Sequence, residues 1–225
     1  MNTKLERFLT CIKRERTRKI FAFIIYVYYI LMPMEIELPS AVEFVIGIVV
    51  SFIFLFGAII YITEWMDKMY EKNKGKLEQR INKELKKVGK EILMFIPILL
   101  ISKIIVYFVM VGQPVNQTNV EKLFYEAPIF MSIFTIIIGP IIEEFIFRFL
   151  PYKFIKNKAV YIVVSTIVFA AMHVIDDTNP FYCIWFYMMR PLYYGYRYHK
   201  TKNILVPLSM HSLNNMVEVL KLVFP

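Results

Sequence analysis

The sequence has little of the polar surface that a soluble domain of its length requires. Only 20% of its 225 residues are charged, whereas 58% are hydrophobic and 16% are aromatic, and the mean hydropathy is +0.52. This composition excludes an ordinary soluble globular domain. It predicts an all-α, polytopic protein of the cell membrane, with about seven transmembrane helices and a polar site at mid-membrane depth.

Motifs that would indicate cross-linking, zinc binding or secretion are also missing. The two cysteines, Cys11 and Cys183, have no spacing that pairs them or places them in a metal motif, so we expect free thiols. The His-Glu-x-x-His spacing of many zinc peptidases is absent. No small-x-small cleavage site precedes the acidic turn at Glu35 and Glu37, which favours an uncleaved first span over a signal peptide.

The net charge of +9 comes from basic residues that lie between apolar runs. They form no recognisable nucleic-acid motif, so we expect no nucleic-acid partner and predict contact with anionic lipid of the inner leaflet. The basic clusters lie at 4–19, 68–90, 153–158 and 197–202, while the intervening loops hold mainly acidic residues. The positive-inside rule therefore predicts a cytoplasmic amino terminus, an external carboxyl terminus and an odd number of spans.

The chain divides into three predicted parts. Residues 1–19 form a basic amphipathic juxtamembrane segment. Residues 20–126 form transmembrane helices. They include a charged cytoplasmic loop at 64–91, which is either a helical hairpin or a helix extension, and a polar loop at 112–126. Residues 127–225 form a core of four helices. The seven predicted spans cover residues 20–34, 41–62, 92–111, 127–152, 159–175, 181–198 and 204–224.

Three charges interrupt the fourth of these spans. A charge at mid-bilayer costs about 2.5–3.5 kcal/mol, so Glu143, Glu144 and Arg148 need partners or water. Glu144 and Arg148 are four residues apart, on one helical face, and are expected to form an ion pair. Glu143 is rotated by about 100° from Glu144 and is left to face water or substrate. A helix break expected at Gly139-Pro140 frees backbone groups, which a membrane tolerates beside a wet cavity.

Polar residues on two later spans reach a similar depth. Counted from the basic residues at the inner ends of their spans, Glu143 lies roughly 15 Å deep and His173 roughly 22 Å deep at 1.5 Å per residue. On the same count, His211 and Asn215 lie roughly 13 and 19 Å deep. A lone histidine is most often a hydrogen-bonded core residue, but this convergence of three helices indicates a common site. His211 and Asn215 are four residues apart and point into it, whereas Asn214 is expected to point elsewhere.

A carboxylate, a water molecule and two imidazoles in one site indicate hydrolysis. In the favoured hypothesis, Glu143 takes a proton from water, which attacks a peptide carbonyl. His211 and Asn215 donate to the developing oxyanion, and His173 positions the water. In an alternative, a zinc ion held by His173, His211 and Glu143 activates the water. The cofactor is therefore either none or Zn²⁺.

Three short motifs in these spans resemble those of the CAAX-protease and bacteriocin-processing family (CPBP, or Abi) of intramembrane proteases, related to the type II CAAX prenyl endopeptidases. Glu-Glu-x-x-x-Arg, Phe-x-x-x-His and His-x-x-x-Asn match, in family order, Glu143, Glu144 and Arg148, then Phe169 and His173, and then His211 and Asn215. The glycine that commonly follows the motif arginine is Phe149 here. The resemblance covers about residue 127 to the end, and it implies that residues 127–225 are a catalytic core in which the polar motif residues act.

The resemblance also implies a substrate class, namely peptides or membrane proteins, including peptides of the bacteriocin or signal type. Family members are often described as metalloproteases, although a glutamate-based mechanism is also argued for them. A non-catalytic bacteriocin-immunity or scaffold protein of the same fold stays an alternative. A transporter is disfavoured because the sequence has no internal repeat. For Lys103 and Arg190, pairing or snorkelling is a simpler interpretation than a role in the site.

Overall fold

The computed structural model describes residues 77–109 and 112–224, and within these ranges every regular element is helical. The all-α prediction is confirmed for this part of the chain. The predicted juxtamembrane segment 1–19, the first two predicted spans and residues 64–76 lie outside the described residues.

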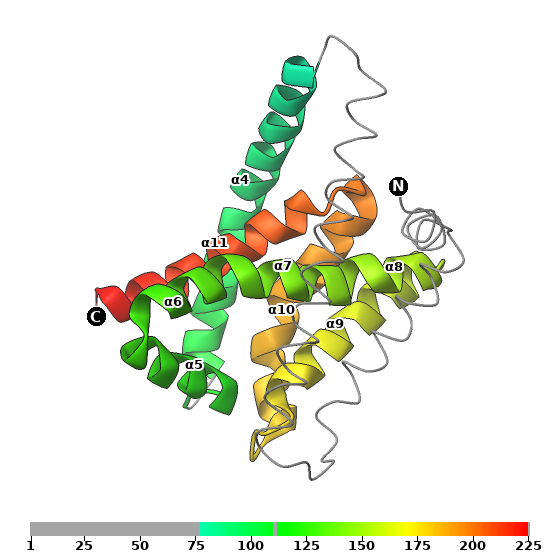
Figure 1. Ribbon diagram of the computed structural model, residues 1–225. Helices are drawn as coiled ribbons and strands as arrows, with labels where there is room; N and C mark the ends of the chain where they lie inside the picture. The colour runs from blue at the N-terminus through cyan, green and yellow to red at the C-terminus, as the bar shows by residue number, and fades with distance from the viewer. Residues whose placement is uncertain (1–76, 110–111, 225) are drawn as a thin grey trace, which may run out of the picture.

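Six helices, one of them built from five segments, make up the described part of the molecule (Figure 1). The segments from α6 to α8 follow one another without interruption and are called the α6–α8 rod below; its η segments are π-helical turns. In chain order the elements are α4 (Leu77–Val109), α5 (Val115–Glu126), α6 (Pro128–Ile133), η1 (Phe134–Ile138), α7 (Gly139–Glu144), η2 (Phe145–Phe149), α8 (Leu150–Phe154), α9 (Lys158–Val174), α10 (Pro180–Thr201) and α11 (Leu205–Val223).

Two helices among the described residues are long and apolar enough to cross a membrane. They are Ile81–Phe108 and Pro128–Phe154, whereas the apolar helix Lys158–Val174 is shorter. Helices α10 and α11 occupy the ranges predicted for the last two spans but do not meet this criterion. The count of seven spans therefore stays a prediction. Residues 77–91 of the charged loop are a helix extension, since they continue directly into the third predicted span.

The prediction of a polar loop at 112–126 is wrong, because residues 115–126 form α5. Pro114 precedes the helix in an extended conformation, with φ −59° and ψ 146°. The carboxylate of Asp177 accepts a hydrogen bond from the backbone N–H of Val115 at 2.8 Å, which satisfies one of the free donors at the helix start. Buried Phe124 packs with Met131 and Val219. Burial of this face stabilises a helix whose overall polarity suggested a loop.

The helix break predicted at Gly139-Pro140 is also wrong. Gly139 is helical, with φ −54° and ψ −55°, and its N–H donates to Phe134 O, five residues back. Leu150 makes the same contact with Phe145 O, and each of these bonds is followed directly by a proline. In a regular α-helix the proline ring clashes with the carbonyl four residues back. A π turn adds a residue to that turn, so the rod absorbs the proline without breaking.

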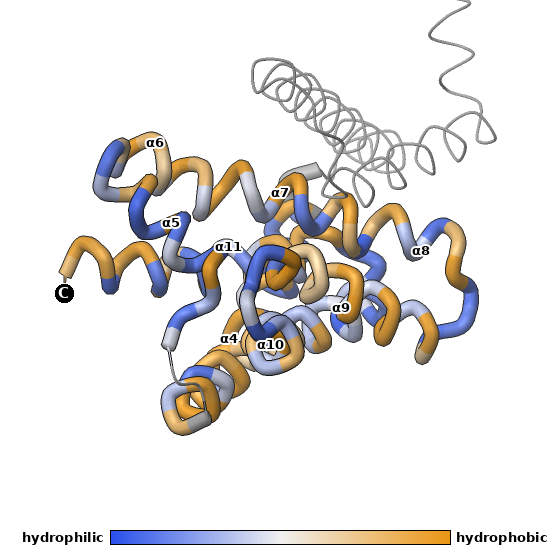
Figure 2. The backbone as a smooth tube through the Cα atoms, turned by 90° about the horizontal axis from the view of Figure 1, so that it is seen from below, coloured by the Kyte–Doolittle hydropathy of each residue, from blue (hydrophilic) through white to orange (hydrophobic). Residues whose placement is uncertain are grey.

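Packing of the other helices around the rod creates the space for a site. Helices α9 and α10 lie side by side (Figure 1), and they approach closely at Gly195, where a Cβ atom would lie 3.2 Å from Ser165 Oγ. Helix α11 packs against η1, α7, α10 and α4. Figure 2 shows mainly hydrophobic residues along α9, whereas α5 is hydrophilic over much of its length. Helix α4 is charged in its first half and mainly apolar from Ile92 onward. The described part of the predicted variable region, α4 and α5, therefore packs directly on the predicted core.

Candidate active site

The α6–α8 rod buries an ion pair at its centre. Glu144 and Arg148 are both 0% exposed, and Arg148 Nε lies 3.5 Å from Glu144 Oε2, as their spacing predicts. The guanidinium also lies 4.7 Å from the centroid of the Phe169 ring, where the ring electrons attract a cation. Two buried charges are thus balanced against each other, which offsets part of the cost of removing them from water.

Helix α11 brings His211 against both glutamates of the rod. His211 Nδ1 lies 2.9 Å from Glu144 Oε1. A carboxylate paired with arginine accepts hydrogen bonds, so Nδ1 is the nitrogen that carries the hydrogen. The other nitrogen, Nε2, lies 3.5 Å from Glu143 Oε2. Glu144 therefore turns the imidazole so that its Nε2 faces Glu143.

Helix α9 presents a second imidazole to the same carboxylate oxygen. His173 Nδ1 lies 2.7 Å from the carbonyl oxygen of Phe169, which only accepts, so Nδ1 carries the hydrogen here too. His173 Nε2 lies 3.7 Å from Glu143 Oε2. In neutral imidazoles both Nε2 atoms accept, as the carboxylate does. Three acceptors that converge in this way suit a group with at least two hydrogens to donate, such as a water molecule.

Asn215 binds a backbone carbonyl oxygen of the rod, that of Thr135, which Pro140 leaves without an intrahelical hydrogen bond. In the π register, in which Gly139 N–H donates to Phe134 O, the next donor would be residue 140 and its acceptor Thr135 O. Proline has no N–H, so the intrahelical bond to Thr135 O cannot form in that register. Asn215 Nδ2 donates to this oxygen instead, at 2.9 Å. The proline thus determines where α11 attaches to the rod.

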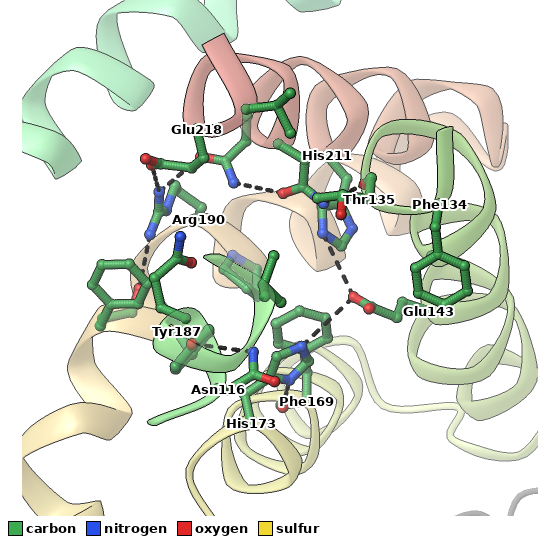
Figure 3. Close-up of a pocket in the computed structure, with 18 of the residues that line it drawn as sticks. Asn116, Phe134, Thr135, Glu143, Phe169, His173, Tyr187, Arg190, His211 and Glu218 are labelled. Atoms are coloured by element: carbon green, nitrogen blue, oxygen red, sulfur yellow. Dashed lines mark hydrogen bonds and ion pairs between the residues drawn. The ribbon is translucent and has the colours of Figure 1, made fainter. Parts of the chain in front are cut away.

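These side chains line a cavity of about 220 Å³ between the rod and α5, α9, α10 and α11. Figure 3 shows Glu143 pointing between His173 and His211, with Arg190 and Glu218 on another part of the wall. Of the six polar residues predicted for the site, Glu143, His173, His211 and Asn215 line the cavity, whereas Glu144 and Arg148 do not. The structure therefore brings four predicted residues to one cavity and places the other two behind them.

The rod directs Glu143 into this cavity and keeps Glu144 out of it. A Cβ atom at Gly139 would lie 3.2 Å from Phe134 O and 3.8 Å from Glu143 Oε1. The first approach is tight and the second is an ordinary contact, so glycine relieves crowding at the π turn and a Cβ atom would just touch the carboxylate. The Glu143 side chain keeps 23% of its surface exposed, in contrast to fully buried Glu144. Adjacent glutamates consequently occupy different environments, one facing the cavity and one inside the protein.

The prediction that Asn214 points away from the site is wrong. Asn214 lines the cavity, and its Nδ2 donates to Asn215 Oδ1 at 3.0 Å. His211 and Asn214 are three residues apart. A spacing of three residues places two side chains on the same face of a helix, just as a spacing of four does. The same spacing links Asn215 to Glu218, which also lines the cavity. Both residues were detectable from the sequence had both spacings been applied.

Arg190, Lys103 and Glu218 form a charged cluster next to Asn214. Arg190 NH1 donates to Asn214 Oδ1 at 2.7 Å and lies 3.8 Å from Glu218 Oε1. Lys103 on α4 also contacts Glu218 Oε1, and Lys221 contacts Glu218 Oε2 at 3.0 Å. Both Lys103 and Arg190 therefore pair with a carboxylate, which was one of the two simpler interpretations of these residues.

The zinc alternative requires three ligands that converge on one point. Across residues 77–109 and 112–224, no three His, Cys, Asp or Glu side chains are arranged to hold a metal ion together. As placed, the side chains of His173, His211 and Glu143 therefore do not fit a zinc ion. The steps proposed below run through the side chains of the chain itself.

Part of the chain is similar to a known protein family. Residues 125–217 match the family described as type II CAAX prenyl endopeptidase Rce1-like. This match supports assignment of the segment to the CPBP and CAAX protease family, as its three motifs predict. The matched range contains the rod from Pro128 onward, α9, α10 and the part of α11 that carries His211 and Asn215. No curated protein and no solved structure matches the chain.

The match to this protease family supports a peptidase in a membrane setting, in agreement with the helices of membrane-spanning length in the described residues. The family match covers Glu143, His173, His211 and Asn215 on the cavity wall and the ion pair behind them. The individual roles of these residues stay predictions.

Proposed function

We propose that the protein is an intramembrane endopeptidase in which Glu143 activates a water molecule for attack on a peptide bond. One observation carries this proposal: a single carboxylate oxygen of Glu143 faces the Nε2 atoms of His173 and His211, at 3.7 and 3.5 Å, on the wall of a cavity. A general base must lie within reach of the proton that it takes, directly or through one water.

The reaction starts when water donates to Glu143 and is oriented by His173 Nε2. Glu143 takes the proton as the water oxygen attacks the carbonyl carbon, which gives a tetrahedral intermediate with a negative oxygen. Asn215 uses one amide hydrogen for Thr135 O and has a second to donate to this oxygen. His211 adds a donor at Nε2 when both of its nitrogens are protonated. Glu143 then passes its proton to the leaving amine, and the C–N bond breaks.

Glu144 and Arg148 act through His211 in this proposal. Glu144 accepts from His211 Nδ1, and Arg148 balances the glutamate charge. This arrangement fixes the ring so that its Nε2 faces Glu143 and the substrate. Positioning groups of this kind keep the reacting atoms in place without touching them.

The predicted topology places this cavity at mid-membrane depth. In the proposal, seven helices cross the cell membrane with the amino terminus in the cytoplasm, basic loops contact the anionic inner leaflet, and residues 127–225 form the catalytic core. Exposed apolar side chains on the two helices of membrane-spanning length, such as Leu100 and Ile137, then face lipid. Substrates are membrane-associated peptides or proteins, including peptides of the bacteriocin or signal type.

Replacement of the base by its isostere tests the proposal. Membrane peptides are compared by mass spectrometry between cells with the wild-type protein and cells with Glu143→Gln, and a synthetic peptide spanning a detected cleavage site is then given to purified protein. Loss of a general base lowers the rate by about 100-fold or more. Glu126→Gln, at an exposed carboxylate on α5, is the matched control and is expected to cleave normally.

Cleavage by Glu143→Gln at the wild-type rate would refute the proposed mechanism. Cells that retain bacteriocin protection with Glu143→Gln would favour the non-catalytic immunity alternative. Protection lost together with cleavage would instead support an enzyme.

A further inference from the structure

A chain of hydrogen bonds crosses the cavity wall from Arg190 to the rod. Arg190 NH1 donates to Asn214 Oδ1 at 2.7 Å, Asn214 Nδ2 donates to Asn215 Oδ1 at 3.0 Å, and Asn215 Nδ2 donates to Thr135 O at 2.9 Å. Every bond in this chain runs in the same direction, from α10 through α11 to the rod.

The two ends of the chain determine its direction. Guanidinium nitrogens only donate, so Arg190 can bind only the oxygen of an asparagine amide. A carbonyl oxygen only accepts, so Thr135 can bind only an amide nitrogen. This oxygen is available to α11 because Pro140 has no N–H for it in the π register, in which Gly139 pairs with Phe134 O. A donor at one end and an acceptor at the other leave one arrangement for both amides.

This direction matters because an asparagine amide can turn over with almost no change in shape. Its oxygen and nitrogen then exchange places, and donors become acceptors. With Asn214 held by Arg190, the nitrogen of Asn214 must face Asn215 Oδ1, and the nitrogen of Asn215 must face the rod and the cavity. Turning either amide over would oppose two oxygens and two N–H groups, which leaves half-buried polar groups on the cavity wall without their hydrogen-bond partners.

Arg190 is itself held firmly. Its side chain is 6% exposed, NH2 donates to Phe186 O at 3.1 Å, and Glu218 lies 3.8 Å from NH1. Lys103 and Lys221 contact Glu218 and stand outside the amide chain, since Arg190 is the cation that reaches Asn214. The cluster therefore separates into one cation that orients Asn214 and two that only balance the carboxylate.

We propose that Arg190 is a positioning residue that, through Asn214, keeps the amide nitrogen of Asn215 directed at the oxyanion. The inference rests on the proposed function, in which Asn215 stabilises the oxyanion. Arg190 and Asn214 touch no reacting atom in this role. Their loss slows the chemical step and leaves substrate binding unchanged.

Asn214→Asp is the sharpest test, because it keeps size and shape and still accepts from Arg190 but cannot donate to Asn215. For the synthetic peptide defined above, we expect kcat to fall about tenfold, the effect of about 1.4 kcal/mol in the transition state, with KM unchanged. Arg190→Met should give a similar fall in kcat, and Arg190→Lys, which keeps a donor, should restore part of it. Lys221→Gln removes a cation from Glu218 without breaking the chain and should leave kcat unchanged.

A double-mutant cycle with Asn215→Ala separates positioning from a general loss of structure. If Asn214 acts through Asn215, Asn214→Asp slows the Asn215→Ala protein little further. Equal losses in both backgrounds, or a change in KM alone, would overturn the inference. Should Arg190→Met fail to fold, Asn214→Asp decides the matter alone.

The two proposals fail in different ways. If the proposed function is wrong, Glu143→Gln keeps its activity. If only the present inference is wrong, Glu143→Gln is inactive while Asn214→Asp retains the full kcat of the wild-type protein.

Discussion

The two helices of membrane-spanning length, α4 and the α6–α8 rod, respond differently to proline. Pro97 lies inside α4, which is assigned as one continuous α-helix. Pro140 and Pro151 in the rod each follow a π turn. The proline in α4 is exposed, whereas Pro140 and Pro151 are buried. In the rod, a proline thus frees a backbone carbonyl inside the protein, where a neighbouring side chain can use it.

The same two helices also hold their charges differently. Lys103 on α4 keeps 18% of its side chain exposed and reaches across to Glu218 on α11. Glu144 and Arg148 in the rod are fully buried and paired within their own helix. Lys103 attaches α4 to α11, and Glu91 of the same helix pairs with Arg197 on α10, whereas Glu144 and Arg148 pair within the rod beside the cavity. This difference predicts that substitutions in the rod have the larger effects.

The largest effect on stability is expected for Glu144→Gln. Within the described residues, Arg148 makes no hydrogen bond through its guanidinium and has Glu144 as its ion-pair partner. Removal of one partner of a buried pair typically costs 3–5 kcal/mol, so we expect a loss of about 3 kcal/mol in the free energy of unfolding. Equilibrium unfolding in detergent measures it, with exposed Glu126→Gln as the control. A loss below about 1 kcal/mol would show that Arg148 has another counter-charge.

Two features of the candidate site could be predicted from the sequence. Glu144 and Arg148 were paired by their spacing alone, and His173 and His211 were brought together by counting residues from the inner surface. Both inferences need only the geometry of a helix. The roles of these residues in the reaction stay predictions.

Features that depend on the backbone could not be predicted in this way. Gly139-Pro140 was interpreted as a break, because proline disfavours an α-helix and the sequence does not show that a π turn absorbs it. The use of Thr135 O by Asn215 follows from that turn. Helix α5 was missed because its polar residues conceal the few apolar ones that pack, such as Phe124. Tertiary packing decided its structure.

A smaller effect, on the rate alone, is expected for Pro140→Ala. The new N–H lies in register to donate to Thr135 O, as Gly139 N–H donates to Phe134 O, and it competes with Asn215 for that oxygen. We expect kcat to fall about threefold to tenfold, which is about 0.7–1.4 kcal/mol. The matched control is Pro97→Ala in α4, which is exposed and away from the cavity and should leave kcat unchanged. Equal rates in the two variants would mean that the proline does not govern Asn215.

A still smaller effect is expected for Lys103→Met. Methionine keeps the apolar length of the side chain, and Glu218 retains Arg190 and Lys221 as counter-charges. Replacement of a partly exposed ion pair by an apolar contact is often nearly neutral. We expect the free energy of unfolding to change by less than about 1 kcal/mol, with kcat within about twofold of wild type. A loss comparable to that of Glu144→Gln would show that the two helices depend on their charges equally.

No effect is expected from removal of metal ions. Glu144 is balanced by Arg148, and Glu143 is partly exposed on the cavity wall, where water can solvate it. As placed, His173, His211 and Glu143 are not arranged to hold an ion together. Purified protein treated with a strong chelator should cleave the synthetic peptide at its original rate and unfold at its original temperature. A bound cation would add to the stability of the folded state, so the unfolding temperature reports on it independently of activity. Loss of cleavage that zinc restores, together with a lower unfolding temperature, would show that His173, His211 and Glu143 rearrange around an ion.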